Sequence, residues 1–313
     1  MQPFFSIIVV CLNPGDKLKA TLESIHKQTF QDYEVVIKDG FSTDGSLECI
    51  EQVFTKEQIA DCGQLASEDE LVDCEKRADA VSESEQAWDT KSKVFLMQEK
   101  DTGIYDAMNQ AAGSAKGKYV YYLNCGDLFY ADTVLKEMAD FIKESPAYKE
   151  AVPGIYYGNI FERLTGQQVA SNPKIDAFGC YRNVPCHQAC FYSRALLLAH
   201  PFETKYKVRA DYEQFLWCFF VGDTEKQVSF AYKDMIVADY EGGGFSETKE
   251  NRRISAAEHK EITGKYMSAG QRMKYRAVLA LTLASLRTAL AENEKTAGLY
   301  NKLKERIYSM KKG

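Results

Sequence analysis

YVYYLNCGD, residues Tyr119–Asp127, is the stretch of this sequence that indicates the fold most directly. A short run of apolar residues that ends at turn-forming residues is typical of a buried strand. Asp127 follows the run at the position where open α/β sheets bind their ligands. Gly126 beside it would allow a ligand or a metal ion to approach the backbone closely. The stretch therefore predicts a buried strand that ends in a ligand-binding acid.

Before this stretch, apolar runs alternate with amphipathic segments. The β-branched runs Phe4–Leu12, Tyr33–Ile37 and Val94–Met97 are typical of buried parallel strands. Between the first two runs, leucine and isoleucine recur with helical spacing. Short connections between strands and helices favour right-handed crossovers and a parallel sheet. The predicted fold class is therefore α/β, with a mostly parallel sheet flanked by helices.

After Asp127 the pattern mixes both kinds of element. A hairpin is predicted around Thr165-Gly166, because strand-forming residues flank this turn on both sides. From residue 247 to the C-terminus the pattern is helical. The other elements predicted here are a short strand at Gln188–Tyr192, a long strand at Val228–Tyr240, and helices at Arg194–His200 and Asp211–Val221.

The composition argues against some classes of function. A net charge of −6 over 313 residues makes nucleic acid an unexpected partner. The nine cysteines are odd in number and form no C-x-x-C pair, which favours free thiols in a reducing compartment. Met1–Phe5 leads into a strand pattern without a basic start, so no secretory leader is expected. Because no apolar run reaches the roughly 18–20 residues of a membrane span, we expect a cytoplasmic protein.

Two segments depart from the average composition. Residues 56–92 are acidic and poor in strand-forming residues, which predicts a helical or loose surface insertion. Residues 270–313 carry ten Lys and Arg against three Glu, a net charge of 10 − 3 = +7. Within them, Ala277–Leu286 is strongly apolar. Two interpretations stay open for these helices: packing on the protein or on a second subunit of a homodimer, and contact with a membrane surface.

Polar side chains follow the ends of four predicted strands: Asn13, Asp39, Asp101 and Asp127. The carboxyl ends of parallel strands meet at one edge of a sheet, so these side chains should converge there. Any one of the aspartates could be a simple turn residue, but three at matching positions favour a site for a cation and a polar ligand. The first strand is followed neither by G-x-G-x-x-G nor by a Walker loop. A metal ion is therefore the expected means of neutralising a bound diphosphate.

Four segments together resemble the family 2 glycosyltransferases, which have the GT-A fold. FFSIIVVCLNPGDKLKATLESIHKQTFQDYEVVIKDGFSTDGS (4–46) and EKDTGIYDAMNQAAGSAKGKYVYYLNCGD (99–127) resemble the first half of such a domain. CHQACFYSRALL (186–197) and VRADYEQFLW (208–217) resemble its acceptor half. The likeness covers most of residues 4–246 apart from the acidic insertion at 56–92. It implies a nucleotide-sugar-binding half at 1–127, an acceptor-binding half of the same domain at 128–246, and a helical extension at 247–313.

The resemblance assigns donor-binding roles to the first half. Asp39 would contact the nucleotide base, and Asp101 and Gly103 would line the nucleotide and sugar site. Asn13 is expected among the donor-binding residues because it follows the first strand.

The end of the fourth strand corresponds to the family's metal-binding motif. It usually carries an Asp-x-Asp type motif, whose last acid binds Mg²⁺ or Mn²⁺ and is Asp127 here. Asn124 and Gly126 stand where acids are often found, which leaves Asp127 as the one carboxylate. Asn124 is expected to contact the donor.

The acceptor half would supply the general base of an inverting displacement. The resemblance gives this role to Asp211; the alternative is that Asp211 caps the N-terminus of its helix. Glu213 is a second candidate base, on a different face of the helix. His187 would lie near the donor diphosphate or the acceptor, or would be a buried core histidine.

The resemblance implies an inverting, metal-dependent glycosyltransferase of the hexosyltransferase type. It would move a sugar from a nucleotide donor such as a UDP-sugar to a glycan or lipid-linked acceptor in bacterial surface polysaccharide synthesis, at the cytoplasmic face of the membrane. Two other classes stay open. A sugar nucleotidyltransferase would need a glycine-rich basic loop after the first strand, which LNPGDKLKA (12–20) matches poorly. A degenerate, non-catalytic binding domain would explain the loss of acids at positions 124 and 126.

Overall fold

The computed structural model describes residues 2–59, 93–222, 228–242 and 248–281. Most of the predicted acidic insertion and the chain after residue 281 lie outside the described residues. The chain divides into two compact units, Met1–His259 and Lys260–Gly313, and each is described by itself. The division into three functional segments stays a prediction.

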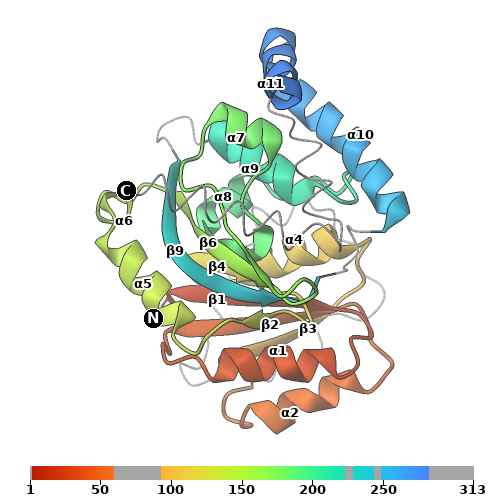
Figure 1. Cartoon of the computed structure of the whole chain (residues 1–313). Helices are drawn as coiled ribbons and strands as arrows, with labels where there is room; N and C mark the ends of the chain where they lie inside the picture. The colour runs from red at the N-terminus through yellow and green to blue at the C-terminus, as the bar shows by residue number, and fades with distance from the viewer. Residues whose placement is uncertain (1, 60–92, 223–227, 243–247, 282–313) are drawn as a thin grey trace. The chain divides into compact units, whose positions relative to one another are not determined.

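Within the described residues, nine strands form one mixed sheet in the first unit (Figure 1). Their order across the sheet is β3-β2-β1-β4-β8-β6-β9-β5, with β7 paired to β6. The strands are β1 (Phe5–Cys11), β2 (Tyr33–Asp39), β3 (Val94–Gln98), β4 (Tyr119–Tyr122), β5 (Leu128–Phe129), β6 (Gly154–Glu162), β7 (Gln167–Val169), β8 (Cys190–Ser193) and β9 (Ser229–Tyr240).

The strands β3, β2, β1 and β4 are neighbours and parallel, as the sequence predicts. Cys11 at the end of β1 is in register with Asp39 at the end of β2, and Asp39 is in register with Gln98 at the end of β3. The carboxyl ends of these strands therefore share one edge of the sheet, which we call the carboxyl edge. The predicted α/β fold class is confirmed.

The other half of the sheet is mostly antiparallel. β8 runs antiparallel to β4 and to β6, the predicted hairpin β6–β7 forms, and β9 lies parallel to β6. The strand expected at Gln188–Tyr192 begins only at Cys190. A short turn of 3₁₀-helix, η2 (His187–Ala189), comes before it. The carbonyl of Gln188 accepts a hydrogen bond from the Tyr121 hydroxyl at 2.7 Å, so this residue is not part of the strand ladder.

Helices cover both faces of the parallel strands. Figure 1 shows α1 and α2 together on one face of β1, β2 and β3, and α4 contacts β1 and β2. The helices of the first unit are α1 (Lys17–His26), η1 (Ser46–Glu48), α2 (Cys49–Val53), α4 (Ile104–Ser114), α5 (Val134–Glu144), α6 (Pro146–Lys149), α7 (Ala177–Arg182), α8 (Arg194–Ala199) and α9 (Ala210–Phe220), followed by the first part of α10 (Lys249–Tyr266).

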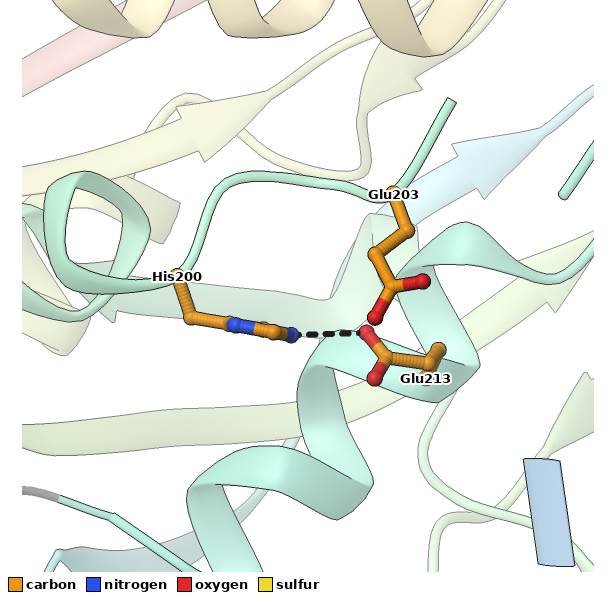
Figure 2. Close-up of side chains that lie close together, drawn as sticks. All are labelled: His200, Glu203 and Glu213. Carbon is orange, nitrogen blue, oxygen red and sulfur yellow. Dashed lines mark hydrogen bonds and ion pairs between the residues drawn. The ribbon is translucent and has the colours of Figure 1, made fainter. Parts of the chain in front are cut away.

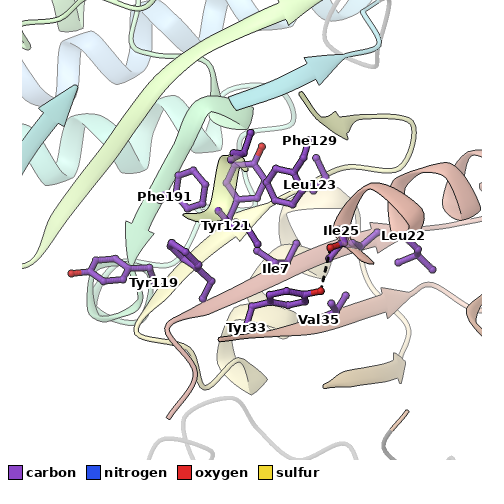
Figure 3. Close-up of a cluster of buried hydrophobic side chains, with 14 of the residues drawn as sticks. Ile7, Leu22, Ile25, Tyr33, Val35, Tyr119, Tyr121, Leu123, Phe129 and Phe191 are labelled. Atoms are coloured by element: carbon purple, nitrogen blue, oxygen red, sulfur yellow. Dashed lines mark hydrogen bonds between the residues drawn. The ribbon is translucent and has the colours of Figure 1, made fainter. Parts of the chain in front are cut away.

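The main hydrophobic core lies between the sheet and the helices α1, α2 and α5 (Figure 3). Tyr121 of β4 is completely buried in it. Its ring stacks between Phe129 and Phe191, with centroid distances of 5.1 and 4.4 Å. Tyr122 points to the opposite face, since side chains alternate along a strand, and its ring lies 5.0 Å from that of His187. Strand β4 is thus fixed from both faces just before it reaches the carboxyl edge.

The second unit contains the end of α10 and the helix α11 (Ala269–Leu281). Ser268 and Gln271 cap the N-terminus of α11. The Ser268 N–H donates to Gln271 Oε1 at 2.9 Å, and the Gln271 N–H donates to Ser268 Oγ at 3.2 Å. Such a capping box satisfies two N–H groups that a helix leaves without partners. No helix in the described part of the chain is long and apolar enough to cross a membrane.

Candidate active site

Asn13 connects the loops that follow β1 and β2. It adopts a positive φ of 48°, a conformation that asparagine tolerates better than most residues. Its backbone N–H donates to Ser42 Oγ at 2.7 Å, and its Oδ1 accepts from the Thr43 N–H at 2.8 Å. Asn13 therefore shapes the rim of the carboxyl edge.

Asp39 lies beneath this rim and is completely buried. Its carboxylate accepts hydrogen bonds from the Ser42 N–H at 2.9 Å, the Ser42 hydroxyl at 2.5 Å and Gln98 Nε2 at 3.1 Å. A buried carboxylate needs donors of this kind because it has lost its contact with water. In this structure Asp39 braces the loop, and its contact with a nucleotide base stays a prediction.

Asp101 and Gly103 lie at the start of α4. Asp101 Oδ1 accepts from the Gly103 N–H at 3.1 Å, and Oδ2 is 2.9 Å from Lys38 Nζ. Gly103 has a φ of 140°, a backbone conformation that favours glycine. The Lys38 side chain is completely buried and also donates to the Glu99 carbonyl at 2.6 Å. Lys38 was not predicted as a site residue, because nothing in the local sequence shows that its side chain is buried against Asp101.

Asp127 sits in a tight turn after β4 and is only 3% exposed. Thr21 of α1 holds this turn: its hydroxyl accepts from the Gly126 N–H and donates to the Asp127 carbonyl, both at 3.0 Å. Asp127 Oδ1 accepts from the backbone N–H of Glu241 at 2.9 Å. Burial raises the pKa of Asp127 to about 6, against hydrogen bonds from Glu241 and Gln188 that lower it.

The residues around Asp127 come from distant parts of the chain. The Lys17 ammonium lies 2.8 Å from Glu241 Oε2. The Arg163 guanidinium lies 3.4 Å from the Gly126 carbonyl and 3.2 Å from Asp239 Oδ1. Lys17, Arg163 and Glu241 were not predicted as site residues. They lie at the start of a helix and at the ends of two strands, where nothing in the local sequence distinguishes them.

The oxygen atoms at the end of β4 suit a hard divalent cation. The Oδ1 atom of Asn124 is buried and has no hydrogen-bond partner among the described residues. A buried polar atom without a partner is costly, which indicates that a ligand completes it. Carboxylate and amide oxygens are ligands that such cations prefer. Asp127 and Asn124 therefore fit Mg²⁺ or Mn²⁺.

His187 is buried on the other face of β4. Its Nδ1 lies 3.3 Å from the Tyr192 hydroxyl, and its Nε2 has no hydrogen-bond partner in the described part of the chain. Its ring packs against Tyr122 and Phe202, with centroid distances of 5.0 and 5.8 Å. Burial lowers the pKa of His187, so the ring is neutral near pH 7. The unsatisfied nitrogen could bind a ligand.

Asp211 lies inside helix α9, one residue beyond its first position. Arg209 occupies the N-cap and makes no side-chain cap bond, so the alternative role of Asp211 as a helix cap is not what the structure shows. Asp211 Oδ1 instead accepts from the Tyr105 hydroxyl at 2.8 Å. Burial raises the pKa of Tyr105 well above its usual value, and the Asp211 charge raises it further. Tyr105 therefore stays a hydrogen-bond donor that orients Asp211.

Asp127 and Asp211 act on a common neighbour. Burial raises the pKa of the Cys186 thiol to about 12, and the charges of both Asp211 and Asp127 raise it as well. Both carboxylates therefore lie within electrostatic range of Cys186, although they are 84 residues apart along the chain (211 − 127).

Glu258 of α10 holds the loop that leads to Asp211. Its carboxylate accepts three consecutive backbone N–H groups, those of Lys207, Val208 and Arg209, at 2.7, 3.1 and 2.9 Å. Hydrogen bonds to a charged acceptor are stronger than neutral ones. Glu258 was not predicted, because its partners lie 49 to 51 residues away along the chain.

Glu213 occupies a different face of α9 from Asp211, as its helical spacing predicts. It is completely buried, and its Oε2 lies 2.8 Å from His200 Nε2 (Figure 2). The His200 ring stacks on Trp217 at 4.7 Å. Glu203 brings a second carboxylate close to this pair, but it forms an ion pair with Lys205 at 3.0 Å. Glu213 is hydrogen-bonded to His200 and Glu203 is paired with Lys205, so each carboxylate of this cluster has a partner within the protein.

Comparisons with known sequences identify relatives of this chain. The family described as "Glycosyl transferase family 2" matches residues 6–61. A PGL/p-HBAD biosynthesis glycosyltransferase of Mycobacterium tuberculosis is 30% identical over 248 residues, which cover 79% of this chain and 80% of that protein. Glycosyltransferase GlyG of Streptococcus pneumoniae is 25% identical over 173 residues, which cover 53% of this chain and 46% of GlyG.

Solved structures share the fold at lower identity. TarS 1–349 of S. aureus in complex with UDP-GlcNAc superposes with a TM-score of 0.54 at 18% identity, over 88% of this chain and 70% of that chain. This chain spans 60% of TarS 1–349 in another crystal structure. The mannosyltransferase PcManGT from Pyrobaculum calidifontis gives a TM-score of 0.53 at 14% identity, over 96% of this chain and 84% of that chain.

The sheet and its carboxyl edge define an α/β protein of the GT-A type. The relatives then decide the family: the chain belongs to glycosyltransferase family 2. It is therefore a glycosyltransferase, as the resemblance of its four segments implies.

The buried charge of Asp127 should cost stability. An acid whose pKa is raised in the folded state penalises that state at pH values above its folded pKa of about 6. The penalty disappears below the pKa of the unfolded chain, about 4. We expect Asp127→Asn, in the absence of ligands, to raise the free energy of unfolding by about 1–3 kcal/mol at pH 7.5 and by much less at pH 4.

Thermal unfolding at both pH values measures this difference, with the exposed Asp132→Asn as the matched control. Asn keeps the acceptor for the Glu241 N–H, so the change removes mainly the charge. An equal or lower melting temperature at pH 7.5 would show that the Asp127 charge does not strain the fold.

Removing Glu258 should release the loop before Asp211. In Glu258→Ala we expect the amides of residues 207, 208 and 209 to exchange hydrogen roughly 10- to 100-fold faster. A hydrogen bond to a charged acceptor stabilises the folded state by about 1.5–3 kcal/mol, and the variant loses these bonds. Hydrogen exchange followed by mass spectrometry measures this, with Glu250→Ala on the exposed side of α10 as the control. Unchanged exchange in this loop would contradict the role of Glu258.

Proposed function

We propose that this protein is an inverting, metal-dependent transferase that moves a hexosyl group from a UDP-sugar to a glycan or lipid-linked acceptor. The observation that carries the proposal is a pair of carboxylates that other residues hold in place: Asp127 accepts from the Glu241 N–H, and Asp211 lies against the Tyr105 hydroxyl. Both are within electrostatic range of the Cys186 thiol. Inverting transfer needs such a pair of opposed functions: one side holds the departing diphosphate and the other removes a proton from the acceptor.

The printed names of the relatives support the class of donor and acceptor. The TarS structure holds UDP-GlcNAc, and the PcManGT structure holds GDP-Man and Mn²⁺. The mycobacterial relative is named for PGL/p-HBAD biosynthesis. A nucleotide-sugar donor, a divalent cation and a surface-glycan acceptor are proposed for this chain on that basis. The UDP moiety and the synthesis of bacterial surface polysaccharide are the finer parts of the proposal.

On the donor side, Asp127 and Asn124 would hold Mg²⁺ or Mn²⁺, and Asn13, Asp39, Asp101, Gly103 and His187 would form the rest of the donor-binding set. The bound cation would neutralise the donor diphosphate and make it a better leaving group. Asp127 must be ionised to hold a cation, and with a pKa of about 6 it is mostly ionised at pH 7.5. Arg163 adds a positive charge beside the same turn.

On the acceptor side, Asp211 would be the general base. The Tyr105 hydroxyl lies 2.8 Å from Asp211 Oδ1 and 2.8 Å from the Val208 carbonyl, and the Asp211 carboxylate would take the proton of the acceptor hydroxyl. The acceptor oxygen then forms its bond to the anomeric carbon while the bond from that carbon to the phosphate oxygen breaks on the opposite face. Glu258 and Tyr105 would keep Asp211 in place from two directions.

The C-terminal helices would bring the enzyme to its acceptor. We propose that the basic extension 247–313 contacts the inner face of the cell membrane or a second copy of the chain. The excess of Lys and Arg over residues 270–313 supports the first interpretation, since anionic lipid surfaces attract such segments.

Loss of either acid should abolish transfer without unfolding the protein. We expect Asp127→Ala and Asp211→Ala each to lower Mn²⁺-dependent release of UDP from a panel of UDP-sugars by at least about 10²-fold, in line with the usual contribution of a general base. Circular dichroism checks the fold, and Asp140→Ala on the exposed side of α5 is the control. Full activity in either variant would refute that residue's role.

A further inference from the structure

Gly126 leaves room for another residue's side chain beside Asp127. It has a φ of 99°, and a Cβ atom at this position would lie 2.5 Å from Glu241 Oε2 and 3.2 Å from Glu241 Cδ. A side chain at position 126 would therefore require the Glu241 carboxylate to move. The Glu241 carboxylate therefore fills the place that a side chain at position 126 would occupy.

The sheet fixes Glu241 at this place. It follows directly after β9, and β9 pairs with β5 so that Asp239 lies opposite Leu128, the residue after Asp127. The Glu241 N–H then donates to Asp127 Oδ1 at 2.9 Å. Strand register thus fixes the backbone of Glu241 beside Asp127.

Two carboxylates, Asp127 and Glu241, lie beside Gly126, and the Lys17 ammonium that pairs with Glu241 can be replaced. Glu241 and Asp127 are close enough that the Glu241 charge raises the pKa of Asp127. Lys17 balances Glu241 across 2.8 Å, but the two side chains are 55% and 38% exposed. Exposed ion pairs of this kind contribute little to stability, so another cation can replace Lys17 at small cost.

We propose that Glu241 is the second protein carboxylate of the divalent-cation site, in place of the acid that the sequence lacks at positions 124 and 126. With a cation bound there, Lys17 would be released from Glu241 and would pair with the donor diphosphate. This inference rests on the proposed function, which places the cation at Asp127.

The chemistry and the charge count agree with this assignment. Asp127, Glu241 and the Asn124 amide offer three oxygen atoms, the ligand type that Mg²⁺ and Mn²⁺ prefer. Two carboxylates neutralise one divalent cation. Lys17 would then be left without its carboxylate partner beside the turn, where its charge suits a diphosphate, while Arg163 stays paired with Asp239.

Binding of Mn²⁺ tests this directly, without catalysis. Free Mn²⁺ is measured by electron paramagnetic resonance, with and without UDP, on the full-length wild type, Glu241→Gln, Asp127→Asn and the exposed Glu137→Gln. We expect Glu241→Gln to weaken Mn²⁺ binding in the presence of UDP by about 10- to 100-fold, as is usual for groups that support a metal site. Glu137→Gln should bind as the wild type does.

A second variant checks the exchange of Lys17. Lys17→Met removes the competitor of the cation, so it should strengthen Mn²⁺ binding in the absence of UDP and weaken binding of UDP to the Mn²⁺-loaded protein. Unchanged Mn²⁺ affinity in a folded Glu241→Gln protein would overturn the assignment, and weaker Mn²⁺ binding by Lys17→Met without UDP would overturn the exchange. If Asp127→Asn loses Mn²⁺ binding but Glu241→Gln does not, the role of Glu241 is refuted and the proposed function stands. If the wild type binds no Mn²⁺ in the presence of UDP, the proposed function itself fails.

Discussion

The hydroxyl of Thr21 is the contact on which the site depends. It joins helix α1 to the turn after β4 by accepting the Gly126 N–H and donating to the Asp127 carbonyl, both at 3.0 Å. Helix α1 is in turn fixed by Leu18 and Leu22, which are completely buried in the main core. The position of Asp127 is therefore set by the packing of the whole parallel half of the sheet, and not by the turn alone.

The second constraint is electrostatic. Asp127 is buried beside Glu241, and the pKa of about 6 records how unfavourable its charge is without a cation. Asp211 is in the opposite situation, because Tyr105 and Glu258 hold this residue and the loop before it with hydrogen bonds. Asp127 thus carries a charge that is unfavourable in the folded protein, whereas Asp211, the proposed base, is held in a fixed place. This difference is what a site for a dianionic leaving group and a neutral acceptor hydroxyl requires.

Local sequence patterns were sufficient for the parallel half of the fold. The runs at β1, β2 and β3 are apolar and β-branched because both faces of these strands are covered, and the acids after them stand out as polar residues at strand ends. The two-residue strand β5 and the short helix α7 were not predicted, because neither has enough residues to show a period. The 3₁₀ turn at His187–Ala189 accepts a hydrogen bond from Tyr121, 67 residues away, a contact that no local pattern reveals.

The candidate site was predictable only where its residues directly follow a strand. Asp127 and Asp101 do so, and the resemblance to the family added Asp211. Glu241 and Glu258 act on partners 114 and about 50 residues away, through strand register and helix packing, and no periodicity reports such contacts. Lys38 is equally hidden, since a buried lysine inside a strand makes sense only once its partner Asp101 is in view.

The most direct test of the account is the anomalous scattering of Mn²⁺ in crystals grown with UDP. The account predicts one strong Mn²⁺ peak against Asp127 at the carboxyl edge, shared with the UDP diphosphate, on the side that faces Asp211. A peak at the cluster of His200, Glu203 and Glu213 instead, or UDP bound away from the ends of β1 to β4, would contradict it.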